Sequence, residues 1–270
     1  MSFLPGMMGL KPAGVPGGGG GGYSAEAQQF LDRLTDPGTT RKDAYAAIID
    51  ALVTAGVWSK LDALWIMAAD SAGNGLVNLK SSSYPLTLVP GSGNPTFDAD
   101  EGFTAENNSH YIDTGFNPST AGGQFSQNSA HFSFWSRTAS PSPNNVALMG
   151  NGAAGTSGES NLFPAYSGAD FYGRVNVNSS SAFGTVPDAS GHFIANRSSS
   201  TALQGYRNGA AVGSGVTATS QAPLSANFLI CRATGGVSGD AKFAAASIGA
   251  SLSSGEAAAL YAALNGNKWW

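Results

Sequence analysis

The stretch LQGYRNGAAVGSG, residues 203–215, predicts a tight β-hairpin. An aromatic residue and a charged residue precede the dipeptide Asn208-Gly209, and small apolar residues follow it in alternation. Asn-Gly tolerates positive φ at both central positions, so it suits the type I′ turn that matches the twist of paired strands. The stretch therefore predicts two antiparallel strands that meet at Asn208-Gly209.

Further short strands are expected on both sides of this hairpin. Apolar or alternating runs recur from Trp58 onward, separated by clusters of Gly, Ser, Asn and Pro. Phe132 and Phe134 alternate with His131, Ser133 and Trp135, which is the side-chain period of a strand. Short strands with regular turn signals favour an all-β sandwich or jelly roll. The other predicted strands are DALWIMAA (62–69), HYIDTGF (110–116), NVALMG (145–150), DFYGRVNVN (170–178), GHFIANR (191–197), NFLICRA (227–233) and KFAAASIG (242–249).

Three short helices are predicted outside the strands. The first begins with Ser24 as its N-cap, and the second ends at Gly56. The last has Ser253 and Glu256 in capping-box register. The first two helices are too short to form a core of their own, so we expect them to pack on the sandwich. The helical segments are SAEAQQFLDRL (24–34), TTRKDAYAAIIDALVTAG (39–56) and SSGEAAALYAAL (253–264).

The N-terminal segment, residues 1–22, is rich in Pro and Gly and ends in six glycines. Its apolar residues are interrupted by Pro and Gly and follow no basic region, which is not typical of a secretory signal. Adaptable Met side chains suit insertion into a groove on another subunit. We expect an anchoring arm that buries against neighbouring chains, either copies of this protein in a trimer or another protein; the alternative is an arm folded back on its own sandwich. The predicted anchoring residues are Phe3, Leu4, Met7, Met8 and Leu10.

The expected organisation is therefore an arm over 1–22, a helical segment over 23–60 and a β-sandwich domain over 61–270. Charged residues make up 11% of the 270 residues, and the net charge is -4. Nucleic-acid binding normally needs a basic stripe, so no such partner is expected. No apolar run approaches the ~18 residues that span a membrane, so no insertion is expected. The single Cys231 lies in an apolar run and is expected to be a buried packing group.

Four segments resemble, in the expected order, a concanavalin A-like lectin/laminin G-type jelly roll, especially the versions found in tailed-bacteriophage virion proteins. They are GFTAENNSHYIDTGF (102–116), FSFWSRT (132–138), GYRNGAAVGSG (205–215) and FAAASIGASLSSGEAAALYAAL (243–264). The upstream stretches GVWSKLDALWIMAADSAGNGLVNLK (56–80) and PTFDADEGFT (95–104) are similar to phage tail or capsid accessory proteins. The resemblance implies a virion structural protein, a fibre or decoration subunit, that is made in the host cytoplasm and displayed on the virion surface.

An acidic cluster in and after TFDADEG (96–102) contains the candidate catalytic carboxylates and metal ligands of this sequence. Lectin-fold glycosidases use two carboxylates that flank the scissile bond, commonly two residues apart on one strand. Asp98 and Asp100 have that spacing, but they lie in a loop-like stretch, and the Glu-x-Asp-x-x-Glu pattern of that family is absent. We therefore expect a solvated acidic loop and no enzyme. The cluster comprises Asp98, Asp100, Glu101 and Glu106.

The same carboxylates offer oxygen ligands to Ca²⁺. Laminin-type domains often bind calcium at the rim of the sandwich, so the resemblance leaves a calcium site open, although no specific ligands can be carried over. A zinc site is not expected, because the chain has one Cys and its three histidines, His110, His131 and His192, are widely spaced. The sequence thus predicts no required cofactor.

Glycan binding is better supported than catalysis. Sugars are recognised by planar amides and hydroxyls beside an aromatic face, and the segment AYSGADFYGRVNVNSSS (165–181) interleaves such groups. At the period of a strand, its polar side chains share one face and Phe171, Gly173, Val175 and Val177 share the other. The alternative is an ordinary exposed strand. The candidate ligand-binding residues are Tyr172, Arg174, Asn176 and Asn178, followed by Tyr166, Trp135 and Arg137, where Trp135 alternatively packs beneath the terminal helices.

Three functions remain open from the sequence. The first is a decoration or fibre subunit, held by the arm, that adheres to host-surface polysaccharide. The second is a purely structural cement protein of the capsid or tail without a ligand. The third is a polysaccharide-degrading enzyme, for which no constellation of residues is found.

Overall fold

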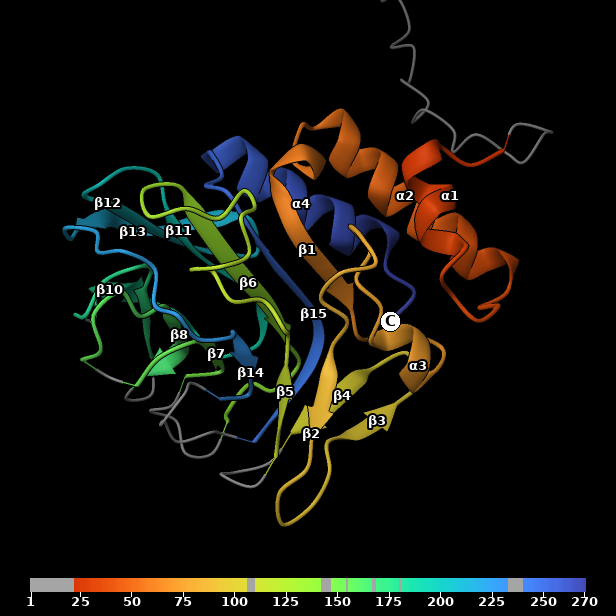
Figure 1. Ribbon diagram of the computed structural model, residues 1–270, viewed down its shortest axis with the longest axis horizontal. Coiled ribbons are helices and arrows are strands. Elements are labelled where there is room, and N and C mark those ends of the chain that lie inside the picture. Colours follow the sequence, from red (N-terminus) through yellow and green to blue (C-terminus); the bar gives the residue numbers. More distant parts are fainter. Residues whose placement is uncertain are drawn as a thin grey trace, which may run out of the picture.

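The computed structural model describes residues 22–105, 110–141, 147–153, 155–166, 169–179, 181–232 and 240–270. Two antiparallel sheets face each other, and helices cover the outer face of one of them (Figure 1). The predicted mainly β sandwich, with two N-terminal helices and one C-terminal helix, is confirmed.

The first sheet has eight strands among the described residues, in the order β13-β12-β11-β6-β15-β4-β3, with β1 added beside β15. Strand β15 is its centre, because β6 pairs along one side while β1 and β4 share the other. The strands are β1 (Leu61–Ile66), β3 (Thr96–Asp98), β4 (Gly102–Ala105), β6 (Ala130–Ser136), β11 (Gly191–Arg197), β12 (Ala202–Arg207), β13 (Ala210–Thr217) and β15 (Ala241–Gly249).

The second sheet has seven strands among the described residues, in the order β10-β9-β8-β7-β14-β5-β2. Its edge strand β10 lies against β13, the edge strand of the first sheet. The strands are β2 (Thr87–Val89), β5 (Tyr111–Asp113), β7 (Met149–Gly150), β8 (Asn161–Tyr166), β9 (Asp170–Arg174), β10 (Ser181–Thr185) and β14 (Leu229–Ile230).

The core between the two sheets is largely aromatic. Phe132 and Phe134 of β6 are fully buried there, as the predicted alternation requires. Phe134 meets Phe243 of β15 edge to face, with ring centroids 5.6 Å apart, and Phe132 lies 5.0 Å from Phe228. Such pairs contribute about 0.5–1.5 kcal/mol each beyond the area they bury. Cys231 also lies in this core, as expected, and burial raises the pKa of its thiol to about 12.

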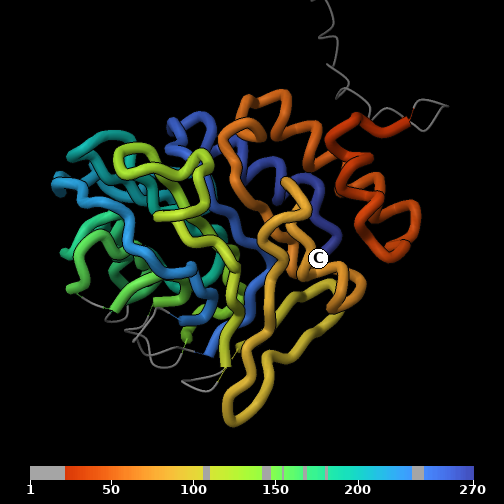
Figure 2. Tube along the Cα trace, in the orientation of Figure 1, coloured from red at the N-terminus to blue at the C-terminus, as the bar shows by residue number. Residues whose placement is uncertain are grey.

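A second core lies between the first sheet and the helices. Phe30 and Tyr45 from the N-terminal helices and Leu260 from the C-terminal helix are fully buried in it, together with Trp135 from β6. The tube in Figure 2 shows these helices side by side although they come from opposite ends of the chain. The helices are α1 (Ala25–Leu31), α2 (Thr39–Thr54), α3 (Ala72–Gly75) and α4 (Ser254–Asn267), with a 3-10 turn η1 (Trp58–Lys60).

The helix boundaries follow the predicted caps. The Ser24 hydroxyl accepts the backbone N–H of Ala27, and Ser253 forms the complete capping box with Glu256. The expectation that the first two helices pack on the sandwich is confirmed. None of the helices within the described ranges is long and apolar enough to cross a membrane.

The hairpin 203–215 is formed by β12 and β13. Asn208 has φ 50° and Gly209 has φ 78°, the two positive values of a type I′ turn. The turn packs against α4, because a Cβ placed on Gly209 lies 3.0 Å from the Cα of Ala258 and 3.2 Å from the Cβ of Tyr261. The hairpin prediction is confirmed, and the structure adds that the turn is a docking point for the last helix.

A buried hydrogen-bonded chain runs along the helix-facing side of the first sheet. His131 Nδ1 contacts the carbonyl of Ala250, which can only accept, so this nitrogen carries the proton. Its Nε2 then accepts from Ser247, Ser247 accepts from Ser133 at 2.7 Å, and Ser133 accepts from His192 Nε2 at 3.1 Å. Each hydroxyl has one proton to donate, so the chain has a single direction, and His131 must be neutral for its Nε2 to accept.

We expect Gly209→Val to lower the free energy of unfolding by about 1–3 kcal/mol, because a β-branched residue is strained at positive φ. The new side chain also meets α4. The matched control is Gly122→Val, at φ 64° with nothing within 4 Å of a Cβ. Urea unfolding should show a larger loss for Gly209→Val than for Gly122→Val. An unchanged midpoint for Gly209→Val would contradict the turn assignment.

We expect the stability to fall as the pH drops from about 8 to about 5. Burial lowers the pKa of His131 to about 4 and that of His192 to about 3, whereas both are near 6.5 in the unfolded chain. The unfolded state therefore binds more protons in this window, and each histidine removes roughly 2 kcal/mol between pH 8 and pH 5. In the His192→Phe variant, the loss of stability between pH 8 and pH 5, measured by thermal unfolding, should be smaller than in the parent protein. An equal loss in both proteins would exclude His192 as a source of the pH dependence.

Candidate binding site

The expected solvated face over 172–178 does not exist as one surface. Strand β9 ends at Arg174, so the alternation of a strand stops there. Asn176 has φ 54°, which turns the backbone. Arg174 and Asn176 are buried, Tyr172 is half-buried and Asn178 is exposed. The prediction that all four side chains face solvent together is therefore wrong for Arg174 and Asn176.

Arg174 is held by a buried carboxylate. Its Nη1 donates to Glu159 Oε1 at 2.8 Å, and the Glu159 side chain is completely buried. Burial raises the pKa of Glu159 above its ordinary value, although the N–H of Gly155 and the guanidinium of Arg174 both favour the charged form. The guanidinium also lies 5.6 Å from the centroid of the Phe163 ring. Arg174 thus links two strands of the second sheet and does not present its charge to solvent.

Asn176 holds the chain that follows β9. Its side-chain amide donates to the carbonyls of Ser126 and Gln127, at 3.1 Å in each case. Its backbone N–H donates to the hydroxyl of Ser160 at 3.0 Å. These contacts fix the segment 176–179 and so determine where Asn178 and Ser179 lie.

Trp135 and Arg137 lie elsewhere. Trp135 is stacked on Tyr261 of α4, with centroids 5.6 Å apart, and on His192 at 5.8 Å. The alternative interpretation, in which Trp135 packs beneath the terminal helices, is confirmed. Arg137 is half-buried and donates from Nη2 to the carbonyl of Asp100 at 3.0 Å. Neither side chain lines the groove described below.

The acidic cluster is neutralised by basic side chains of the protein itself. Lys242 binds Asp98 at 2.9 Å and also binds Glu101, and Arg41 binds Asp100 at 2.5 Å. Across the part of the chain that the structure describes, no three His, Cys, Asp or Glu residues gather as a metal site would require. Glu106 and the anchoring residues Phe3, Leu4, Met7, Met8 and Leu10 lie outside the described residues.

An aromatic patch lies on the outer face of the second sheet, formed by Phe163, Tyr166 and Tyr172. Phe163 of β8 is paired directly with Tyr172 of β9. The rings of Tyr166 and Tyr172 are 5.1 Å apart, and those of Phe163 and Tyr166 are 5.8 Å apart. Tyr166 is 36% exposed, an unusual value for a large aromatic side chain in this structure. The patch offers three inclined aromatic rings with two hydroxyl groups.

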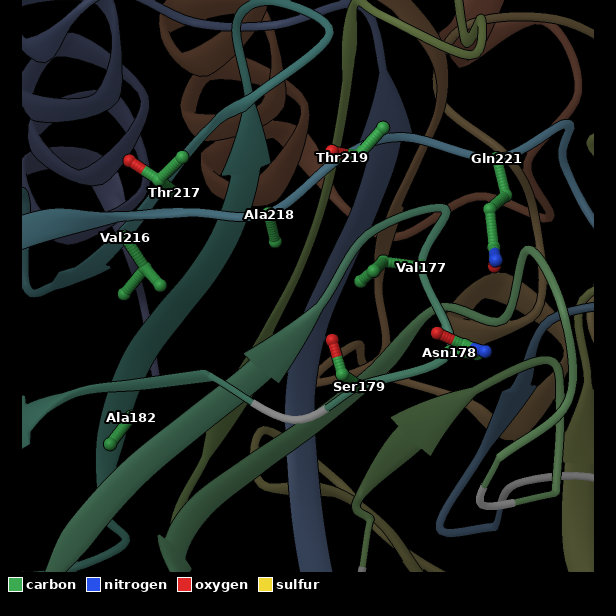
Figure 3. A pocket seen from close by; sticks show the side chains of 9 residues that line it. All are labelled: Val177, Asn178, Ser179, Ala182, Val216, Thr217, Ala218, Thr219 and Gln221. Carbon is green, nitrogen blue, oxygen red and sulfur yellow. The ribbon is translucent and has the colours of Figure 1, made fainter.

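A groove of about 560 Å³ opens beside this patch. Strands β10 and β13 touch where Gly184 meets Gly213, and the groove lies where they separate. In Figure 3, Ala218 points down from the wall formed by residues 216–219 toward Ser179 on the other wall. No lining residue is charged. They are Val177, Asn178, Ser179, Ala182, Val216, Thr217, Ala218, Thr219 and Gln221.

The groove and the aromatic patch adjoin. Ala182 lines the groove and is paired across β10 and β9 with Tyr172. Antiparallel partners project to the same face, so the two features meet at this pair. Of the seven predicted ligand residues, Tyr166, Tyr172 and Asn178 lie on this combined surface. The prediction missed the wall from Val216 to Gln221, whose alternating small and hydroxyl side chains directly follow the hairpin.

No protein-family model matches the chain, and no curated protein matches it in sequence. Its fold is similar to that of several solved structures. Domain 4 of an extracellular GH43 arabinanase from Geobacillus stearothermophilus, solved in complex with arabinotriose, is 16% identical, with a TM-score of 0.54 over 74% of this chain and 98% of that one. A β-sandwich fold is what this similarity shows.

Two longer proteins contain a similar fold. The Trypanosoma rangeli sialidase in complex with sialic acid is 14% identical, with a TM-score of 0.52 over 78% of this chain and 34% of that one. The binding domain of botulinum neurotoxin DC in complex with rat synaptotagmin II is 11% identical, with a TM-score of 0.53 over 78% of this chain and 52% of that one. The chain thus spans about half or less of these two proteins.

Proposed function

We propose that this chain is a carbohydrate-binding module with a lectin-like sandwich. The observation that carries the proposal is the groove, whose described lining residues are uncharged, beside the exposed Tyr166 and its neighbour Tyr172. A sugar presents C–H surfaces that pack on an aromatic ring, together with hydroxyls that pair with amides and hydroxyls. Asn178, Ser179 and Gln221 supply such groups at the groove. Aromatic side chains are efficient binding contacts, because they offer a large contact area and lose little conformational entropy when a ligand binds.

Two structural similarities support this class of ligand. The arabinanase domain was solved with arabinotriose, and the sialidase with sialic acid. Both are carbohydrates, and both proteins share the sandwich fold with this chain. The ion pairs that occupy Asp98, Asp100 and Glu101 favour binding over hydrolysis, so we propose no enzymatic activity.

The module belongs, in this proposal, to a bacteriophage virion. It is a decoration or fibre subunit on the virion surface, made in the host cytoplasm, and it adheres to host-surface polysaccharide. Residues 1–22 dock it to other virion proteins or to copies of itself in a trimer. The support is the sequence resemblance of residues 62–264, together with the apolar residues of the arm.

We expect Tyr172→Ala and Tyr166→Ala to weaken retention on host polysaccharide at least ten-fold, because each removes one ring of the aromatic patch. Ten-fold corresponds to about 1.4 kcal/mol, within the range for an aromatic anchor. The matched control is Tyr111→Ala, which removes a half-buried tyrosine of β5 in the same sheet. Thermal unfolding of each variant checks that the fold is kept.

Retention of both variants at the parental level would contradict the assignment of the patch. A parent protein that binds no member of a glycan array and no host polysaccharide would favour the cement alternative. Release of shortened oligosaccharides from the bound polysaccharide would favour the enzyme alternative.

The docking role of the arm has its own test. We expect a variant lacking residues 2–22 to remain folded, because described residues from Ala27 onward build both cores. We expect light scattering to give a trimeric mass for the full chain and a monomeric mass for the variant, and the variant should not be incorporated into particles. Normal incorporation of the shortened protein would contradict the anchoring proposal.

A further inference from the structure

Arg197, the last residue of β11, is completely buried. Its Nε donates to the carbonyl of Val175 at 2.7 Å, and its Nη1 donates to the carbonyls of Ala218 at 2.9 Å and Ser199 at 3.1 Å. Its Nη2 has no hydrogen-bond partner within the described part of the chain. A guanidinium carries five N–H donors in a fixed fork, so two of them are unsatisfied in the interior.

The charge of Arg197 is also not balanced. None of the salt bridges between described residues includes it. Burial lowers the pKa of its guanidinium to about 10, so it remains charged at neutral pH. Buried charges are normally paired, and Arg174 with Glu159 shows the usual arrangement in this same protein. Arg197 is therefore a buried cation that has no acidic partner among the described residues.

The carbonyls that Arg197 contacts belong to the segments that build the groove. Ala218 lines one wall, and Val175 lies two residues before Val177, which lines the other. Around the edge of a planar guanidinium, the N–H groups of Nη2 lie between the N–H of Nε and the N–H groups of Nη1. The unsatisfied N–H groups of Arg197 therefore lie in the interior between the carbonyl of Val175 and those of Ala218 and Ser199. None of the described lining residues of the groove is charged, and the nearby charges of Arg174 and Glu159 are paired with each other.

We infer that the groove selects a glycan that carries a carboxylate, attracted by the charge of Arg197. The inference rests on the proposed function and names the class of sugar for that site. A carboxylate in the groove interacts with a cation that is held in a water-poor interior, where screening is weaker than between two surface charges. A neutral sugar of the same shape gains nothing from this charge. Asn178, Ser179 and Gln221 remain available for its hydroxyls in either case.

The test uses the full chain and an array of uronate- and sialate-containing oligosaccharides, each printed beside its carboxyl-reduced form. We expect binding to at least one acidic member and at least ten-fold weaker binding to its reduced partner. Raising the salt concentration from about 50 to about 500 mM should weaken only the acidic interaction. Equal binding of acidic and reduced forms would overturn the inference and leave carbohydrate binding standing. Binding of no member at all would overturn both.

A variant series assigns the selectivity to Arg197. Arg197→Met should reduce the ratio of acidic to reduced affinity to near one, and Arg197→Lys should keep most of it, because Lys retains the charge. The matched control is Lys42→Met, which removes a positive charge from the start of α2 and should leave the ratio unchanged. If Arg197→Met does not fold, the salt dependence of the parent decides: a ratio of acidic to reduced affinity that falls at high salt supports the assignment, and a ratio that salt does not change overturns it.

Discussion

The burial of both faces of the first sheet is the constraint on which the rest of this structure depends. Every residue of β6 is buried, the phenylalanines against the second sheet and Trp135 beneath α4. A sheet buried on both sides needs a cover for each, since its apolar side chains are costly to leave in water. The second sheet covers one face, and helices from the two ends of the chain cover the other.

This arrangement decides where a ligand can bind. The helices α1, α2 and α4 occupy much of the outer face of the first sheet. The outer face of the second sheet and the side of the sandwich where β10 and β13 separate are left open. The aromatic patch and the groove lie there, and both are carried by strands whose positions are set by the aromatic core.

The polar interior shows three different solutions to burying hydrogen-bonding groups. The chain from His192 to His131 remains neutral and satisfies its donors in one direction. Arg174 is charged and paired with Glu159. Arg197 is charged, bound only by carbonyls and unbalanced. The first two need no added charge, although Nδ1 of His192 has no hydrogen-bond partner among the described residues. Of the three, Arg197 alone is a charge without an acidic partner among the described residues, and in our proposal a carboxylate bound in the groove is attracted by it.

The sequence by itself determined the local structure, because turn and cap signals act over a few residues. Asn208-Gly209 predicted a type I′ turn, and Ser253 with Glu256 predicted the start of a helix. The alternation around Phe132 and Phe134 predicted a strand with two distinct faces. The tertiary structure alone decided the site. Arg174 and Asn176 share the period of Tyr172, but β9 ends at Arg174, so Glu159 and the carbonyls of Ser126 and Gln127 take them into the interior. The groove joins residues 177–182 with 216–221, and only the approach of two sheet edges brings those segments together.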